Sequence, residues 1–299
     1  MCKGLLPQSE YRFNNTLIQE AAYENLLKSR RQALHRRIGE VLRDQFAASA
    51  AVEPELLAHH FTQAGMPEAA TESWGKAGRR SLERSALVEA VAQLTRALDQ
   101  IAALPGTPAL RREAIKLQVA LITPLAHVKG FAALETKAAV EQARLLIEQA
   151  QALGEAPEDP LLLFLVVYAV VIESFVAFNG DKILEGAAQF LTLAEKEGSA
   201  VPLLIGHRLY GGGLMFAGKI AESRPHFDRA TALYEPTKHR QLAMRFGQDA
   251  KVSVLSFRSL ALWMLGYPDA ALADTDMLLS EGREIDQAAT LMLRWSMHR

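Results

Sequence analysis

The stretch HRLYGGGLMFAGKIAESRPHFDRATALYEP, residues 207–236, decides the fold. Two helical runs flank a glycine, and small residues recur on both runs at helical spacing. The positions are Tyr210 with Gly211, then Gly218, then Ser223 with Phe227 and Ala230, and finally Pro236. Residues three or four apart share one face of an α-helix, so small side chains there let a second helix approach closely. The stretch therefore predicts two antiparallel helices joined by a tight turn at Gly218.

This pattern resembles the tetratricopeptide repeat, a helical hairpin of about 34 residues. The match is degenerate, because His207 and Leu214 stand where the repeat has its usual aromatic residues. Other stretches keep the same order of residues: Ser259, Gly266 and Ala271 within 255–282; Ala58, Gly65, Ala70, Trp74 and Ala77 within 56–78; and Ser85, Ala90, Leu94 and Ala97. Gly218 and Gly266 are 48 residues apart, and we interpret residues 235–249 as an insertion.

Helical periodicity continues along the chain, with glycine and proline at the ends of the periodic segments. The predicted helices are 16–28, 30–46, 53–64, 67–83, 86–103, 108–128, 131–153, 160–178, 181–197, 201–217, 219–234, 249–265, 268–281 and 286–298. The one strand candidate is EYRF, residues 10–13. We expect an all-α fold, a tetratricopeptide-like right-handed α-solenoid of antiparallel helical hairpins.

Composition indicates a globular chain without an obvious charged partner. The 299 residues carry 33 basic and 34 acidic side chains, and 49% are hydrophobic. Because the basic and acidic side chains nearly balance, the net charge does not favour nucleic acid or an anionic membrane as a partner. The single cysteine, Cys2, excludes an intramolecular disulfide and a cysteine-based zinc cluster. We expect a cytoplasmic protein.

The most apolar segment is LLLFLVVYAVVIESFVAF, residues 161–178. Its uninterrupted apolar run ends at Ile172 after twelve residues, whereas a membrane span needs about 20. We interpret the segment as a buried core helix with neighbours on most of its circumference, and no membrane partner is expected.

No pattern in the sequence indicates catalysis, a cofactor or a bound metal. The glycines 211–213 lack the strand, lysine and helix start of a phosphate loop, so we interpret them as a site of close helix contact. The eight histidines contain no pair at the spacing of helical metal ligands, and His59 and His60 point in different directions on a helix. Glu155, Glu158 and Asp159 stand in a proline-containing loop and are interpreted as solvated.

A basic cluster lies near the start, formed by Lys28, Arg30, Arg31, His35, Arg36, Arg37 and Arg43. It has no interleaved aromatic residues, and apolar residues make the same segment amphipathic. A solvated helix face is the favoured interpretation, followed by a partner contact; nucleic acid is the least favoured.

A second resemblance covers most of the chain. Residues 11–42, YRFNNTLIQEAAYENLLKSRRQALHRRIGEVL, are similar to the junction that follows the ATPase core in bacterial signalling ATPases of the STAND class. The matching positions are Phe13, Leu17, Ile18, Ala22, Tyr23, Leu26, Arg31, Leu34, His35, Arg36 and Ile38; Asn15 replaces the usual histidine. Residues 54–78 and 239–272 are similar to the helical repeats of that family.

The resemblance implies a domain organisation and a class of function. Residues 1–46 would be the remnant of a winged-helix-like module with connecting helices, and residues 47–299 divergent repeats with a truncated C-terminus. The pairing partners of EYRF would be missing, so residues 1–15 are expected to be poorly ordered or unpaired. In the family such regions are fused to class III adenylate or guanylate cyclases, kinases or transcriptional regulators, but no catalytic motif of those domains is in this chain.

We expect a non-enzymatic regulatory scaffold, the sensor or autoregulatory tail of a signalling ATPase. Its partner would be a protein or peptide, including the parent ATPase or cyclase domains. The repeat positions place Arg208, Met215, Ser256 and Trp263 on the partner-binding groove. Two alternatives stay open: a cyclase or ATPase label inherited from full-length relatives, and a fragment of a DNA-binding transcriptional regulator.

Overall fold

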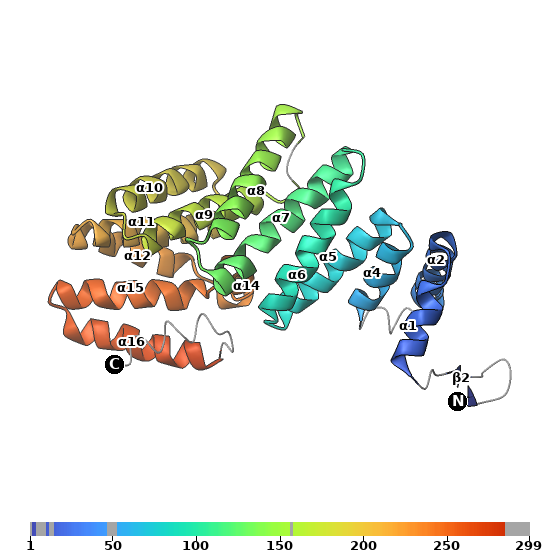
Figure 1. The fold of residues 1–299 in the computed structure, drawn as a ribbon. Coiled ribbons are helices and arrows are strands. Elements are labelled where there is room, and N and C mark those ends of the chain that lie inside the picture. The colour runs from blue at the N-terminus through green and yellow to red at the C-terminus, as the bar shows by residue number, and fades with distance from the viewer. Residues whose placement is uncertain (1, 4–9, 12–14, 47–52, 156–157, 285–299) are drawn as a thin grey trace. The chain divides into compact units, whose positions relative to one another are not determined.

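The computed structural model describes residues 2–3, 10–11, 15–46, 53–155 and 158–284. Within these residues the fold is all-α apart from one short pair of strands (Figure 1). The helices are α1 (Thr16–Glu24), α2 (Lys28–Gln45), α4 (Pro54–Gln63), α5 (Pro67–Glu83), α6 (Leu87–Ala102), α7 (Pro108–Lys129), α8 (Leu134–Ala152), α9 (Leu161–Val176), α10 (Gly180–Glu197), α11 (Ala200–Phe216), α12 (Ile220–Leu233), α13 (Pro236–His239), α14 (Leu242–Phe246), α15 (Ala250–Met264) and α16 (Pro268–Glu284). The helix predicted at 286–298 lies outside the described residues.

The chain divides into two compact units, which are described separately. Unit 1 comprises residues 1–77 and 96–104, and unit 2 comprises residues 78–95 and 105–299. These units do not follow the boundary predicted at residue 46. The winged-helix interpretation of residues 1–46 stays a prediction.

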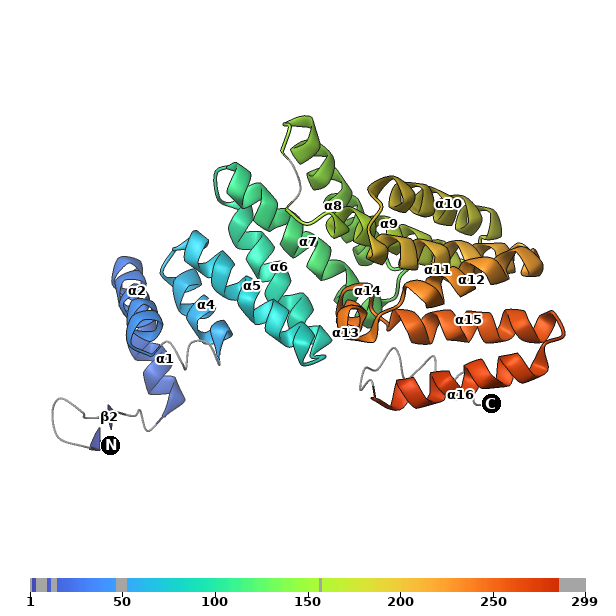
Figure 2. The same ribbon diagram turned by 180° about the vertical axis from the view of Figure 1, so that it is seen from behind.

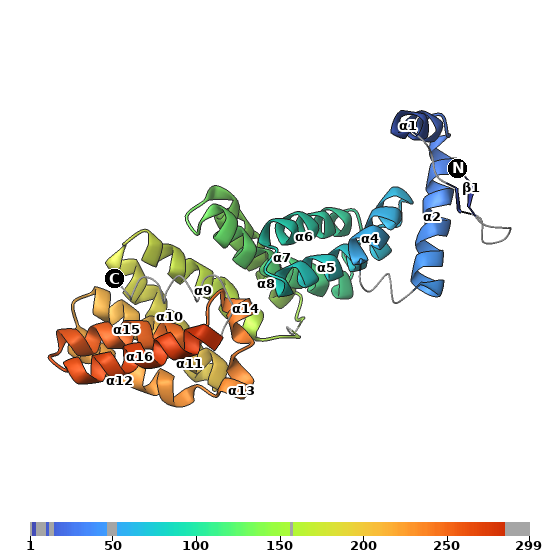
Figure 3. The same cartoon turned by 90° about the horizontal axis from the view of Figure 1, so that it is seen from below.

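The short pair of strands belongs to unit 1 (Figure 3). β2 (Glu10–Tyr11) pairs antiparallel with β1 (Cys2–Lys3), with Cys2 opposite Tyr11. The prediction that this segment would be unpaired is therefore wrong for Glu10 and Tyr11, because a partner lies a few residues upstream in the same chain. Residues 12–14, the rest of the predicted strand and its link to α1, lie outside the described residues.

The hairpin predicted within residues 207–236 is confirmed. α11 and α12 pack side by side in unit 2, and the turn between them contains Gly218 at φ +77°. That left-handed backbone angle favours glycine. Ser223, Phe227 and Ala230 on α12 are fully buried. The small and aromatic positions thus form the contact between the two helices.

The three consecutive glycines of α11 allow close approach by three neighbouring helices. A Cβ added at Gly211 would lie 2.9 Å from the ring of Phe227 on α12. One at Gly212 would lie 3.2 Å from the ring of Phe175 on α9, and one at Gly213 would lie 3.3 Å from the α10 backbone. The interpretation of residues 211–213 as a site of helix packing is therefore confirmed.

Residues of the other repeat-like stretches are also buried at turns and contacts. α15 and α16 are joined through Gly266 at φ +84°, with Ser259 and Ala271 buried on the two helices. In unit 1, α4 and α5 are joined through Gly65 at φ +69°. The same small residues thus recur at hairpin turns and helix contacts in both units.

α9 is the core helix of unit 2. It packs against α7, α8, α10, α11 and α14, and it buries side chains on several sides, among them Leu162, Phe164, Tyr168 and Val171. This confirms the interpretation as a buried helix for residues 161–176, whereas Phe178 is exposed in the turn that follows. Within the described ranges, no helix is long and apolar enough to cross a membrane.

Candidate functional site

The four side chains predicted to face a groove have different environments. Arg208 is 4% exposed and Ser256 is 3% exposed. Met215 is half-buried against the core that contains Phe227, whereas Trp263 is 64% exposed. A buried side chain offers no surface to a partner, so the placement of Arg208 and Ser256 on an open groove is wrong. Partner binding by Trp263 stays a prediction.

Arg208 is enclosed by contacts from other parts of unit 2. Its guanidinium lies 5.3 Å from the centre of the Tyr168 ring on α9, and Nη1 donates to the Ser253 hydroxyl at 2.5 Å. Gln248, two residues before α15, contacts the same tyrosine, because its side-chain amide donates to the Tyr168 hydroxyl at 3.2 Å. The ring of Phe246 on α14 packs edge-on against Tyr168 at 5.1 Å. The predicted insertion therefore packs against the ring that holds Arg208.

The insertion, residues 235–249, is an ordered part of unit 2. It forms α13 and α14, and α14 lies beside α7 and α9 (Figure 2). The Thr123 hydroxyl on α7 donates to the carbonyl of Arg245 at 3.1 Å, and Arg245 pairs with Asp159 at 2.6 Å. These contacts could not be predicted from local sequence patterns, because they join residues 86 or more positions apart.

Replacing Arg208 with methionine is expected to stabilise the protein. Nε and Nη2 of Arg208 have no hydrogen-bond partner among the described residues, so these buried donors lose hydration without compensation. Methionine has a similar length and no charge, and we expect it to raise the free energy of unfolding by about 1 kcal/mol or more. Urea unfolding followed by circular dichroism measures the change. A lower unfolding midpoint would show that Arg208 has stabilising contacts that outweigh its burial.

An exposed apolar face is present on α15 and the turn after it. Leu260, Trp263, Met264 and Tyr267 are 43%, 64%, 63% and 50% exposed. Spacing of three and four residues places Leu260, Trp263 and Met264 on one face of α15, and Tyr267 follows in the turn after the helix. We call these four residues the α15 stripe. Phe257 on the same helix lies 6.4 Å from the ring of Phe216, which is 44% exposed on α11. The apolar surface of α15 is thus close to an exposed aromatic ring of the neighbouring hairpin.

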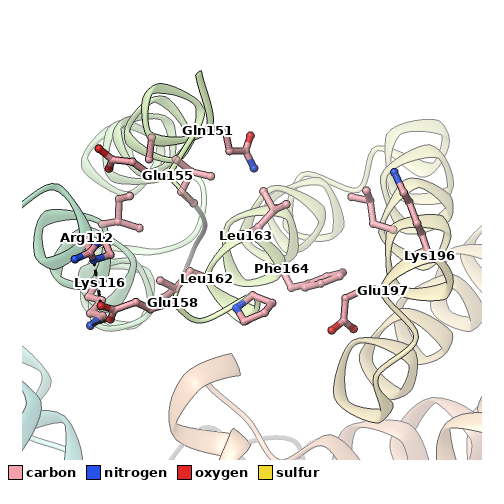
Figure 4. A pocket seen from close by; sticks show the side chains of 15 residues that line it. Arg112, Lys116, Gln151, Glu155, Glu158, Leu162, Leu163, Phe164, Lys196 and Glu197 are labelled. Atoms are coloured by element: carbon pink, nitrogen blue, oxygen red, sulfur yellow. Dashed lines mark hydrogen bonds and ion pairs between the residues drawn. The ribbon is translucent and has the colours of Figure 1, made fainter. Parts of the chain in front are cut away.

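A cavity of about 320 Å³ lies between α7, α8, α9 and α10 (Figure 4). Its wall is mainly apolar, formed by side chains such as Ile115, Ile147, Leu162, Phe164 and Leu193. Charged side chains of α7, of the loop between α8 and α9, and of the end of α10 border it: Arg112, Lys116, Glu155, Glu158, Lys196 and Glu197. The arrangement suits a ligand with an apolar body.

Most of the charges that border the cavity are paired. Glu158 accepts from Arg112 at 3.1 Å and forms a second ion pair with Lys116, which lowers the pKa of Glu158. Glu155 pairs with Arg111, and the hydrogen bond from that guanidinium likewise lowers the pKa of Glu155. Glu158 is exposed, in agreement with the prediction that these loop carboxylates are solvated, whereas the Glu155 side chain is only 13% exposed and is largely covered. Both pair with basic side chains of α7.

The fold brings together histidines that are far apart in the sequence. In unit 1, Nδ1 of His35 on α2 lies 2.8 Å from Nδ1 of His60 on α4, and its Nε2 lies 2.9 Å from the Tyr23 hydroxyl. In unit 2, Nδ1 of His207 on α11 lies 3.0 Å from Nδ1 of His226 on α12. These pairs were missed because helix-spacing rules detect only neighbours within one helix. Among the residues that the structure describes, no group of histidine, cysteine or carboxylate side chains could hold a metal ion.

The free energy of unfolding is expected to fall as the pH drops below about 6.5. Burial lowers the pKa of His35, and His59 adds to the effect. Burial also lowers the pKa of His207, with contributions in the same direction from His226 and Arg229 and an opposing one from Glu195. The unfolded chain then binds more protons than the folded one, so stability is present above this pH and is lost below it. Each such histidine contributes at most about 1.4 kcal/mol per pH unit.

Urea unfolding between about pH 5 and pH 8 measures this slope. The double variant His35→Gln, His207→Gln keeps a hydrogen-bonding side chain at both positions without a titrating imidazole. We expect it to have a shallower dependence on pH than the wild type. Equal slopes for the two proteins would contradict the prediction.

Two arginines of the predicted basic cluster make contacts within unit 1. The guanidinium of Arg31 lies 5.2 Å from the centre of the Tyr23 ring, and that of Arg43 lies 5.9 Å from the Phe61 ring. Arg43 also pairs with Asp44 at 2.7 Å. These contacts favour the interpretation of the cluster as a helix face over nucleic-acid binding.

Comparison with known proteins adds a distant similarity. No family model matches the chain. A protein of Rhizobium meliloti (strain 1021), described as "Uncharacterized protein R02095", is 29% identical over 275 residues. The aligned region covers 89% of this chain but 26% of that protein, so the chain spans about a quarter of the length of its relative.

Proposed function

We propose that this chain is a non-enzymatic protein-interaction module with a regulatory role. In the proposal it is a tetratricopeptide-like α-solenoid and acts in the cytoplasm as the sensor or autoregulatory tail of a bacterial STAND-type signalling ATPase. The observation that carries the proposal is the α15 stripe, an exposed apolar helix face within an array of packed hairpins.

The stripe differs from scattered surface hydrophobics. Single exposed apolar residues are common on soluble proteins, but side chains on successive turns of one helix form a continuous patch. Trp263 at its centre belongs to a residue type that contributes strongly to binding in protein interfaces. A partner segment with an apolar face, such as an amphipathic helix, would bury this patch.

Two observations support the assignment to a larger signalling protein. The similarity of residues 11–42 to the junction in STAND ATPases implies an ATPase core in the parent protein. The relative from Rhizobium meliloti is much longer than its aligned part, as expected if regions like this one occur within longer chains.

Site-specific photo-crosslinking in the native cell tests the proposal. A photoreactive amino acid replaces Trp263 in one variant and Val88 in a control, since Val88 is also exposed, at 65%, but lies on α6. We expect a defined protein to crosslink to position 263 and not to position 88. Purified components should then bind, and Trp263→Ala should weaken that binding by about tenfold or more. Equal crosslinking at both positions, or unchanged affinity, would reject the stripe as the binding surface.

A further inference from the structure

The cavity between α7, α8, α9 and α10 has the size and wall of a small-molecule site. Small-molecule pockets have volumes of about 300–1,000 Å³ and mostly apolar walls. This cavity, of about 320 Å³, falls at the lower end of that range. Ile115 and Ile147 come from α7 and α8, and Leu162, Phe164 and Leu193 come from α9 and α10. Protein interiors are normally filled by packed side chains, and a ligand here would fill space that these side chains leave open.

The size of the cavity limits the ligand to a short chain. A water molecule occupies about 30 Å³ in the liquid, and a methylene group is of similar size, so the cavity holds about ten heavy atoms. The apolar wall favours hydrocarbon for most of these atoms. An extended sugar or nucleotide would leave several polar groups without partners against this wall.

The charges around the cavity indicate an anionic head group. Arg112 and Lys116 are both paired with Glu158. Glu197 accepts from the backbone amide of Ser199 at 2.9 Å. Lys196, on the last turn of α10, borders the same cavity and has no ion-pair partner among the described residues. This ammonium group, which has no ion-pair partner in the part of the chain that the structure describes, would pair with a ligand carboxylate.

We propose that this cavity binds a single-chain aliphatic carboxylate of about eight to ten carbons, with its chain between α7, α8, α9 and α10 and its carboxylate at Lys196. The inference goes beyond the proposed function, and it does not depend on partner binding at the α15 stripe. Ligand binding in the cavity and crosslinking at Trp263 are separate measurements, so one can fail while the other succeeds.

Isothermal titration calorimetry with the full chain tests the fit of the hydrocarbon. The probes are hexanoate, octanoate and decanoate below the concentration at which they form micelles. We expect one molecule bound per chain, with affinity increasing about fourfold for each added methylene that the cavity buries. No binding of decanoate at millimolar concentration, or affinity independent of chain length, would overturn the proposal.

Variants of two lysines on α10 test the head group. Lys196→Gln is expected to weaken decanoate binding by about tenfold and to leave the binding of decanol unchanged. Lys182→Gln is the matched control, because Lys182 is an exposed lysine of the same helix that does not border the cavity. An equal effect of both variants, or tighter binding of decyltrimethylammonium than of decanoate, would overturn the assignment of an anion.

A cavity-filling variant tests the location. Leu163 is half-buried and lines the cavity, and Leu163→Trp places a larger side chain there. We expect both decanoate and decanol to lose affinity while the helical circular dichroism signal is retained. Retained binding in a folded Leu163→Trp protein would place the ligand elsewhere. If this variant does not fold, the comparison of the two lysine variants still decides the proposal.

Discussion

Replacing Phe227 with alanine is expected to lower the free energy of unfolding by about 3–5 kcal/mol. The ring is fully buried on α12, where it faces Gly211 of α11 and stacks with Phe257 of α15 at 6.4 Å. Its removal leaves a cavity that α11 cannot fill by moving closer, because the flanking Gly212 and Gly213 are already in contact with α9 and α10. Urea unfolding followed by circular dichroism measures the loss.

Phe178→Ala is the control for this prediction. Phe178 is 82% exposed in the turn after α9, and its replacement should change the free energy of unfolding by no more than about 0.5 kcal/mol. Similar losses for the two variants would mean that Phe227 is not a specific contact between hairpins. That result would also weaken the repeat interpretation of residues 207–236.

The local features of the fold could be predicted because their signals are local. Thr107 followed by Pro108 is a pair typical of a helix start, and the Thr107 side chain accepts from the amide of Leu110 at 3.3 Å. Gly198 belongs to the residue type that commonly ends helices in the left-handed conformation, and it does so at φ +82°. A cap needs only a few consecutive residues, so one sequence contains the information that specifies it.

One helix start is not specified by residue type alone. Asn179 and Asp181 both have side chains that can cap a helix, but α10 begins at Gly180, and it is the side chain of Asn179 that accepts from the amide of Lys182 at 3.3 Å. Asp181 instead lies in the first turn, where a negative charge also interacts favourably with the helix dipole. Asn179 and Asp181 are two positions apart, and both residue types favour the N-cap of a helix. The sequence alone therefore does not show which of them caps α10.

The sites could not be predicted, because they depend on contacts between distant segments. Arg208 was assigned to an open groove by its repeat position, yet the insertion packs against the tyrosine that holds it. His35 and His60 meet across two helices, and the cavity forms where four helices leave space between apolar side chains. A repeat pattern specifies which residues face a neighbouring helix, but it does not specify what an insertion covers.

Replacing Arg258 with methionine is expected to cost about 3–5 kcal/mol of unfolding free energy. The Arg258 guanidinium on α15 donates to both carboxylate oxygens of Asp274 on α16, at 2.7 and 2.6 Å, and Nη1 donates to Asp228 at 3.1 Å. Asp274 is 5% exposed, so removal of the arginine leaves a buried carboxylate without its cation. Hydrogen bonding to Asp274 also raises the pKa of Arg258.

An exposed ion pair and a double variant separate the possible reasons for such a loss. Arg144 pairs with Glu141 at 2.6 Å on the surface of α8, and Arg144→Met should cost no more than about 1 kcal/mol. Adding Asp274→Leu to Arg258→Met removes the buried charge, and we expect it to restore most of the stability in urea unfolding. If the double variant is as unstable as Arg258→Met alone, the loss comes from packing of the arginine stem and not from the buried carboxylate. The contact between α15 and α16 would then depend on side-chain volume more than on charge.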